Sequence, residues 1–152
     1  MVEDDGQVRI AVVLLVDGAG RVLLQERDEH APRAANQWGM VGGHVEPGEG
    51  FEAAAYRELA EETGVVLPAG SLHEWRHGHF RYADLTEAFD YTVWVARVDL
   101  RDEDIVVGEG RQIVFVAPGD VPALDTAESC AHFVPAFLGS DTYRTLVRGG
   151  AA

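Results

Sequence analysis

The hydrophobic pattern begins with an apolar, β-branched run over Arg9–Val16. A second strand-like run follows at Arg21–Arg27, and the segment between them, Asp17–Gly20, carries the aspartate and glycine that are typical of tight turns. The pattern therefore predicts a β-hairpin. Neither run approaches the roughly 20 residues that a membrane-spanning helix needs.

The next regular element predicted by the pattern is a helix over Phe51–Thr63. This segment, FEAAAYRELAEET, is rich in strong helix formers, and Gly64 stands where a C-terminal cap belongs. The preceding segment, Trp38–Val45, contains too many glycines for a long regular element.

Further strands are predicted at Leu72–Tyr82, Phe89–Val98 and Gln112–Val116, with an acidic loop at Asp99–Asp104. The tail, about residues 126–147, predicts helical structure interrupted at Pro135 and Gly139. Strands on both sides of a central helix, followed by a second helical region, predict an α/β fold with a mixed sheet covered by helices. A length of 152 residues fits one domain, with flexible ends expected at about residues 1–7 and 148–152.

The charge balance changes the functional expectation. The net charge is −14, which argues against a nucleic-acid polymer as partner, since such binders present basic surfaces. All 12 basic residues are arginines, so a Walker A loop and a Schiff-base lysine are both excluded. If this acidic protein handles phosphates, cations from solution must screen them.

Cysteine usage and the N-terminus bear on the compartment. The single cysteine, Cys130, excludes an internal disulfide and is compatible with a reducing cytosol. The first residues carry Glu3, Asp4 and Asp5 instead of the basic start of a signal peptide. We therefore expect a cytoplasmic protein with no membrane partner. Cys130 has apolar neighbours, which favour a buried small residue over a nucleophile.

Three glutamates fall on one face of the predicted helix. At 3.6 residues per turn, Glu58 and Glu62 lie about 40° apart and Glu61 about 60° to the other side of Glu58. Like charges at this spacing destabilise an isolated helix, whereas a hard cation such as Mg²⁺ binds through carboxylates and substrate phosphates. A solvated helix face is the alternative interpretation.

The residues before the helix favour the metal site. Gly42, Gly43 and Gly48 allow the backbone to turn sharply and approach an ion or ligand closely. Glu49 precedes Arg57 by eight residues, so a loop folding back onto the helix brings the two together. The planar arginine fork suits such a pair better than lysine would.

With these residues in place, the segment Gly43–Val65 resembles a complete Nudix box, G-x5-E-x7-R-E-U-x-E-E-x-G-U, where U is an apolar aliphatic residue. Every fixed position matches, and Leu59 and Val65 occupy the two U positions. The resemblance implies an α/β/α sandwich with a mixed sheet between helices. It also implies metal-assisted hydrolysis of a diphosphate linkage in a nucleoside diphosphate joined to another group.

The same resemblance assigns roles to individual residues. It implies Mg²⁺ or Mn²⁺, two or three ions per site, held by the carboxylates of Glu58, Glu61, Glu62 and Glu109 and by the carbonyl of Gly42. Its catalytic set comprises Glu49, Arg57, Glu61, Glu62 and Glu109. Glu109 lies in Val107–Gly110, which resembles the family loop that supplies a further glutamate to the metals or to the attacking water. Either Glu109 or one of the helix glutamates takes the proton of that water. An ordinary loop glutamate is the alternative for Glu109.

Two residues outside the box are candidates for substrate contact. Arg27 ends the hairpin where family members often carry a phosphate-contacting arginine, although a strand-end surface arginine is an equal alternative. Asp125 stands where relatives that cleanse oxidised guanine nucleotides carry a purine-contacting asparagine. An aspartate can still accept hydrogen bonds from guanine nitrogens, so this substrate is in doubt and not excluded.

A cluster of histidines and aromatic residues surrounds the third predicted strand. His73, His77 and His79 fit a polar strand surface better than a metal site, because the expected cation prefers oxygen ligands. The neighbouring aromatics, Trp75, Phe80 and Tyr82, fit the sheet core better than a base-stacking surface.

The sequence therefore predicts a hydrolase acting on a small nucleotide-like diphosphate. A Nudix-fold binding or regulatory domain without catalysis is the main alternative, but such a domain should show a broken acid set. An isomerase or RNA-decapping relative needs more chain or a basic surface. The particular nucleotide is not identified, and a homodimer is left open.

Overall fold

The computed structural model describes residues 7–149, so most of the two ends expected to be flexible, residues 1–7 and 148–152, lies outside the described residues. The strands are β1 (Arg9–Val16), β2 (Val22–Glu26), β3 (Trp38–Gly39), β4 (Val41–His44), β5 (His73–Phe80), β6 (Phe89–Arg97) and β7 (Gln112–Val116). The helices are α1 (Phe51–Thr63), α2 (Glu128–Leu138) and α3 (Asp141–Val147), with short 3₁₀ helices at Asp102–Asp104 and Pro118–Ala123.

Strand β1 lies at the centre of a mixed sheet. One of its edges pairs in parallel with β6 along its whole length. Its other edge is divided, because the first half pairs with β4 and Val16 pairs with Val22 of β2, both antiparallel. Strand β5 extends the sheet beyond β6, while β3 and β7 pair with β2. The predicted hairpin and the predicted mixed sheet are both confirmed.

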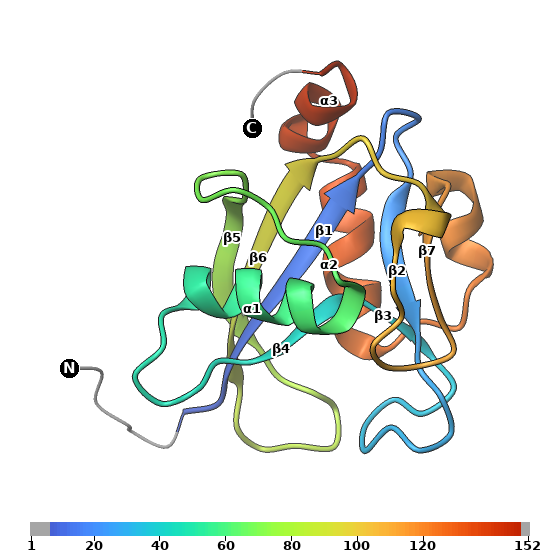
Figure 1. Cartoon of the computed structure of the whole chain (residues 1–152). Helices are drawn as coiled ribbons and strands as arrows, with labels where there is room; N and C mark the ends of the chain where they lie inside the picture. The colour runs from blue at the N-terminus through green and yellow to red at the C-terminus, as the bar shows by residue number, and fades with distance from the viewer. Residues whose placement is uncertain (1–6, 150–152) are drawn as a thin grey trace.

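Helices cover both faces of the sheet, with α1 on one face and α2 on the other (Figure 1). Alternate β1 side chains point to opposite faces, as strand geometry requires. Val12 and Leu14 belong to the same core cluster as Phe137 of α2, whereas Val13 belongs to the cluster that contains Leu59 of α1. Both faces of β1 are therefore buried, which explains its continuous apolar run.

Helix α1 has the predicted bounds. It begins at Phe51 and ends at Thr63. Gly64 then takes the left-handed conformation, with φ 73°, and its N–H donates to the carbonyl of Ala60 at 2.9 Å. This is the glycine cap that the sequence predicts.

The predicted interruption at Pro135 is wrong, whereas the one at Gly139 is confirmed. Helix α2 continues through Pro135 to Leu138. Pro135 itself is exposed, but Val134 and Phe137 beside it are fully buried in the core. Burial of these side chains offsets the backbone hydrogen bond that proline cannot make.

The histidine and aromatic cluster has the predicted character. The Nε2 atom of His77 lies 2.7 Å from an oxygen of Asp90, at the exposed side of β5. Tyr82 is buried, and Trp75 and Phe80 pack against the same core. Cys130 is fully buried, and burial raises the pKa of its thiol to about 12, so it is no nucleophile at neutral pH. Within residues 7–149, no helix is both long and apolar enough to cross a membrane.

Candidate active site

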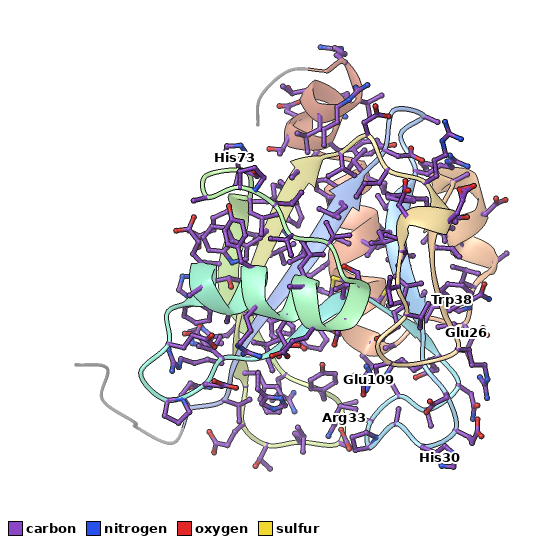
Figure 2. The ribbon with its side chains drawn as sticks, viewed as in Figure 1. Glu26, His30, Arg33, Trp38, His73 and Glu109 are labelled. Carbon is purple, nitrogen blue, oxygen red and sulfur yellow. The ribbon has the colours of Figure 1, made fainter. Side chains whose placement is uncertain are left out.

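A cavity of about 580 Å³ brings together residues that are far apart in the sequence. Its acidic side is formed by Glu58 and Glu62 of α1 and by Glu109 of the loop before β7. Arg27 and Arg33 also line it, and Figure 2 shows Glu109 and Arg33 approaching this region from different loops. The remaining wall is largely apolar and aromatic, and it includes Ile10, Val12, Met40, Tyr82, Phe89 and Tyr91.

Two glycines of β4 allow this strand to pass against the acidic helix. A Cβ at Gly42 would lie 2.3 Å from the carbonyl oxygen of Ala11, and its φ of 143° disfavours other residues. The amide of Gly42 donates to Oε2 of Glu62 at 3.0 Å. A Cβ at Gly43 would lie 2.8 Å from Oε1 of Glu58. Gly42 therefore lets β4 pass close to the backbone of β1, and Gly43 leaves room for the carboxylate of Glu58.

Burial places Glu58 and Glu62 in an unfavourable electrostatic position. Only 8% of Glu62 is exposed, and burial raises its pKa to about 8, with smaller contributions from the charges of Glu58 and Glu109. Burial also raises the pKa of Glu58, against the hydrogen bond that Arg57 donates to it. The buried carboxylate of Glu62 and the partly buried carboxylate of Glu58 repel each other, and a cation beside them would favour their charged forms.

Glu61 differs from its two neighbours on the helix. Its side chain is 59% exposed, does not line the cavity, and accepts a hydrogen bond from Nη1 of Arg57 at 3.2 Å. In the described part of the chain, no three histidine, cysteine, aspartate or glutamate side chains are grouped as around a metal ion. Arg57 contacts both Glu58 and Glu61, so this guanidinium balances their charge. The donors are nevertheless all oxygen atoms, which fits Mg²⁺ or Mn²⁺.

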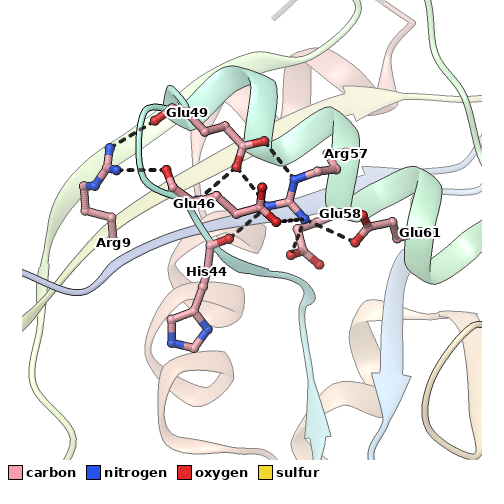
Figure 3. A network of polar contacts seen from close by, with 7 residues as sticks. All are labelled: Arg9, His44, Glu46, Glu49, Arg57, Glu58 and Glu61. Atoms are coloured by element: carbon pink, nitrogen blue, oxygen red, sulfur yellow. Dashed lines mark hydrogen bonds and ion pairs between the residues drawn. The ribbon is translucent and has the colours of Figure 1, made fainter. Parts of the chain in front are cut away.

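The predicted contact between Glu49 and Arg57 is present (Figure 3). The Nε and Nη2 atoms of Arg57 donate to the two carboxylate oxygens of Glu49 at 2.8 and 2.9 Å, a bidentate arrangement. Nη2 also donates to the carbonyl of His44 at 3.0 Å. Hydrogen bonding to Arg57 lowers the pKa of Glu49, so this carboxylate remains charged at neutral pH. Arg57 thus fastens the loop after β4 to α1.

Arg9 makes a second contact with this loop, and the sequence pattern did not predict it. Its guanidinium donates to the carbonyls of Glu46 and Glu49, each at 3.2 Å (Figure 3). Every residue has a backbone carbonyl whatever its side chain is, so the spacing of residue types in the sequence does not indicate such a contact.

The two candidate substrate residues occupy different places. Arg27 lines the cavity, and its Nε donates to the carbonyl of Arg33 at 2.9 Å. Asp125 is exposed and does not line the cavity; its carboxylate accepts a hydrogen bond from Gln37 at 3.0 Å. A substrate contact by Asp125 stays a prediction.

The sequence assigned Tyr82 to the sheet core and did not single out Arg33, Tyr91 or Ser129, and all four line the cavity. The hydroxyls of Tyr82 and Tyr91 bond each other, and Tyr82 donates to Ser129 of α2 at 3.3 Å. Arg33 stacks over the ring of Tyr82, 4.4 Å from its centroid, and forms an ion pair with Asp84 at 3.0 Å. The alternation of side chains along β6 predicts that Tyr91 and Val93 share one face of the sheet. Only the packing of α2 on that face brings Ser129 close to the two tyrosines.

Comparisons with known proteins show which family the chain resembles. A model of the NUDIX domain matches residues 6–137. Isopentenyl-diphosphate Delta-isomerase of Nocardia farcinica is 36% identical over 142 residues, covering 85% of this chain and 75% of that protein. Oxidized purine nucleoside triphosphate hydrolase of Danio rerio is 35% identical over 88 residues, covering 58% of this chain and 54% of that protein.

Solved structures show the same fold. The crystal structure of the MutT protein of Methanosarcina mazei superposes with a TM-score of 0.67, covering 97% of this chain and 98% of that one at 20% sequence identity. The match to the domain model spans most of the chain and includes all of the cavity's acidic residues. The chain belongs to the Nudix hydrolase family.

Proposed function

We propose that this protein hydrolyses a diphosphate linkage in a small nucleotide-like molecule, and that the cavity holding Glu58, Glu62 and Glu109 is its active site. One observation carries the proposal: Glu58 and Glu62 of the Nudix box line one cavity together with Glu109 and Arg27. A domain that only binds nucleotides has no need of a buried Glu62 whose charge is opposed by Glu58 and Glu109.

Nudix proteins typically use divalent metals, and the oxygen donors of this site fit such ions. Glu58, Glu61, Glu62 and Glu109, with the carbonyl of Gly42, would hold two or three Mg²⁺ or Mn²⁺ ions. Such ions neutralise charge on the diphosphate and lower the pKa of the attacking water.

The residues of the chain then have separate tasks. The water oxygen bonds to one phosphorus, the P–O–P bridge breaks, and the bridging oxygen leaves with the second product. Glu109 or Glu62 accepts the proton of the water. Arg27 binds a phosphate oxygen, a role supported by its place in the cavity lining beside the acidic residues. The aromatic wall, including Phe89 and Tyr91, faces the group joined to the diphosphate.

The test is a substrate panel with Mg²⁺ or Mn²⁺, comprising nucleoside triphosphates, nucleotide sugars, ADP-ribose and dinucleoside polyphosphates. Turnover in ¹⁸O-labelled water should place one ¹⁸O on a phosphate product, and Glu62→Gln should abolish this. Nucleotide binding without turnover would instead support the catalytically silent alternative.

An isomerase is a second candidate, because the relative in Nocardia farcinica bears that name. Isopentenyl diphosphate therefore belongs in the same panel. Isomerisation of this compound without ¹⁸O incorporation, and no hydrolysis of any nucleotide, would contradict the proposed reaction.

The proposal also covers location and assembly. A cytoplasmic location is supported by the single buried cysteine, and fractionation tests it. A homodimer stays a prediction that light scattering tests.

A further inference from the structure

Gln25 stands out because it is an amide in a place where the pattern of β2 predicts an apolar side chain. It is only 2% exposed. Leu23, two positions earlier on the same strand face, belongs to the core beneath α1. Burying an amide without a hydrogen bond is costly, so its partner indicates why it is there.

That partner is the backbone of Glu109. Nε2 of Gln25 donates to the carbonyl oxygen of Glu109 at 2.9 Å, across 84 residues of sequence. The Glu109 carboxylate makes no hydrogen bond or ion pair with the residues that the structure describes, so its own side chain does not fix its position. Its place in the cavity therefore depends on how the backbone is held.

The loop is held on its other side by α1. The amides of Val106 and Gly108 donate to the carbonyls of Thr63 and Glu62 at 2.9 and 2.8 Å, which satisfies acceptors that the helix end leaves free. A Cβ at Gly108 would lie 2.4 Å from the carbonyl oxygen of Glu61, so only glycine allows this approach.

The residue after Glu109 makes another close contact. Gly110 has φ 85°, and a Cβ there would lie 2.6 Å from the carbonyl oxygen of Glu26. The amide of Arg111 then donates to the same carbonyl at 2.9 Å, which starts the pairing of β7 with β2. Glu109 therefore sits between α1 and β2, and Gln25 supplies the one side-chain hydrogen bond to its backbone among the described residues.

We propose that Gln25 is a positioning residue, which holds Glu109 at the acidic side of the cavity by binding its carbonyl oxygen. This inference rests on the proposed function for the task of Glu109, but the contact and its effect on the loop can be tested separately. Gln25 does not line the cavity, so it acts through Glu109.

Gln25→Met tests the proposal, because methionine keeps the length of the side chain and removes the donor. Glu109 lies in an exposed loop and methionine suits the buried position of Gln25, so the variant should fold. A displacement near 1 Å can cost about 100-fold in rate, so we expect kcat to fall about 10- to 100-fold with KM nearly unchanged. In a Glu109→Gln background the same change should cost less than about twofold, because both act through one residue.

Hydrogen exchange provides a readout that needs no substrate. Gln25→Met should speed exchange of the amides of residues 108–111. Ile113→Val is the matched control, because Ile113 pairs with Gln25 and is buried but does not contact the loop through a hydrogen bond. It should weaken the β2–β7 pairing without the loss of kcat.

The outcomes separate the two proposals. Equal losses of kcat in both backgrounds, an equal loss in Ile113→Val, or unchanged exchange in the loop would each overturn the role of Gln25. If the wild type turns over no substrate, the proposed function fails. Faster exchange at residues 108–111 in Gln25→Met, but not in Ile113→Val, would then still support the positioning of Glu109.

Discussion

At the scale of single residues, the three glutamates of α1 differ in the groups that bind their carboxylates. Glu62 is held by the amide of Gly42, while Glu58 and Glu61 share the guanidinium of Arg57. Adjacent glutamates therefore occupy different environments, although one helix face carries all three.

Replacement of Glu62 by glutamine keeps its shape and removes its charge. We expect activity to fall about 100-fold or more, the scale of a lost electrostatic stabiliser, with an unchanged circular dichroism spectrum. Glu61→Gln should show a similar loss if its exposed carboxylate joins the ions. Glu103→Gln, in an exposed 3₁₀ helix, is the control. Activity within about threefold of wild type for Glu62→Gln would argue against a metal role.

The contact between Glu49 and Arg57 should matter more for rate than for stability. Arg57→Lys keeps the charge but loses the bidentate fork, so the loop after β4 should shift and kcat should fall about 100-fold. Lysine keeps a positive charge beside Glu49, so the melting temperature should change much less than the rate. Glu49→Gln/Arg57→Lys should be little worse than either single variant. Additive losses would show that the residues act separately.

At the scale of elements, α2 shows tertiary packing overriding a local signal. Its apolar face, which includes Cys130, Phe133 and Phe137, is buried in the core. The helix therefore passes through a proline that would end an isolated helix.

Pro135→Ala should stabilise the protein, because alanine restores a helix hydrogen bond and the exposed proline contributes no core packing. The gain should reach up to about 3 kcal/mol, measured by urea unfolding. Pro118→Ala is the matched control, since Pro118 starts a 3₁₀ helix where proline is favoured. A gain at Pro118 but none at Pro135 would refute this explanation.

At the scale of the whole molecule, the sheet, α1 and the loop before β7 converge on one cavity. We propose that the chain is one domain, and it should therefore unfold in a single transition.

Because the acidic residues repel one another, Mn²⁺ or Mg²⁺ should raise the melting temperature by binding the folded state. A concentration of about 100 times Kd would add about 2.7 kcal/mol to the free energy of unfolding. The increase should shrink in Glu58→Gln and Glu62→Gln and persist in Glu103→Gln. A wild-type melting temperature that is unaffected by millimolar Mn²⁺, with or without nucleotide, would contradict the metal site.

The sequence by itself determined the bounds of α1, its glycine cap and the contact of Glu49 with Arg57, because these depend on spacing along one short segment. It also determined the family, since the Nudix box is continuous in sequence.

Only the tertiary structure decided the rest. Periodicity does not show which strands are neighbours, so the parallel pairing of β1 with β6 was not foreseen. Gln25 and Glu109 are 84 residues apart, and their contact exists only because β7 pairs with β2. The continuation of α2 through Pro135 likewise depends on the core that buries its neighbours, a long-range energy that no local propensity contains.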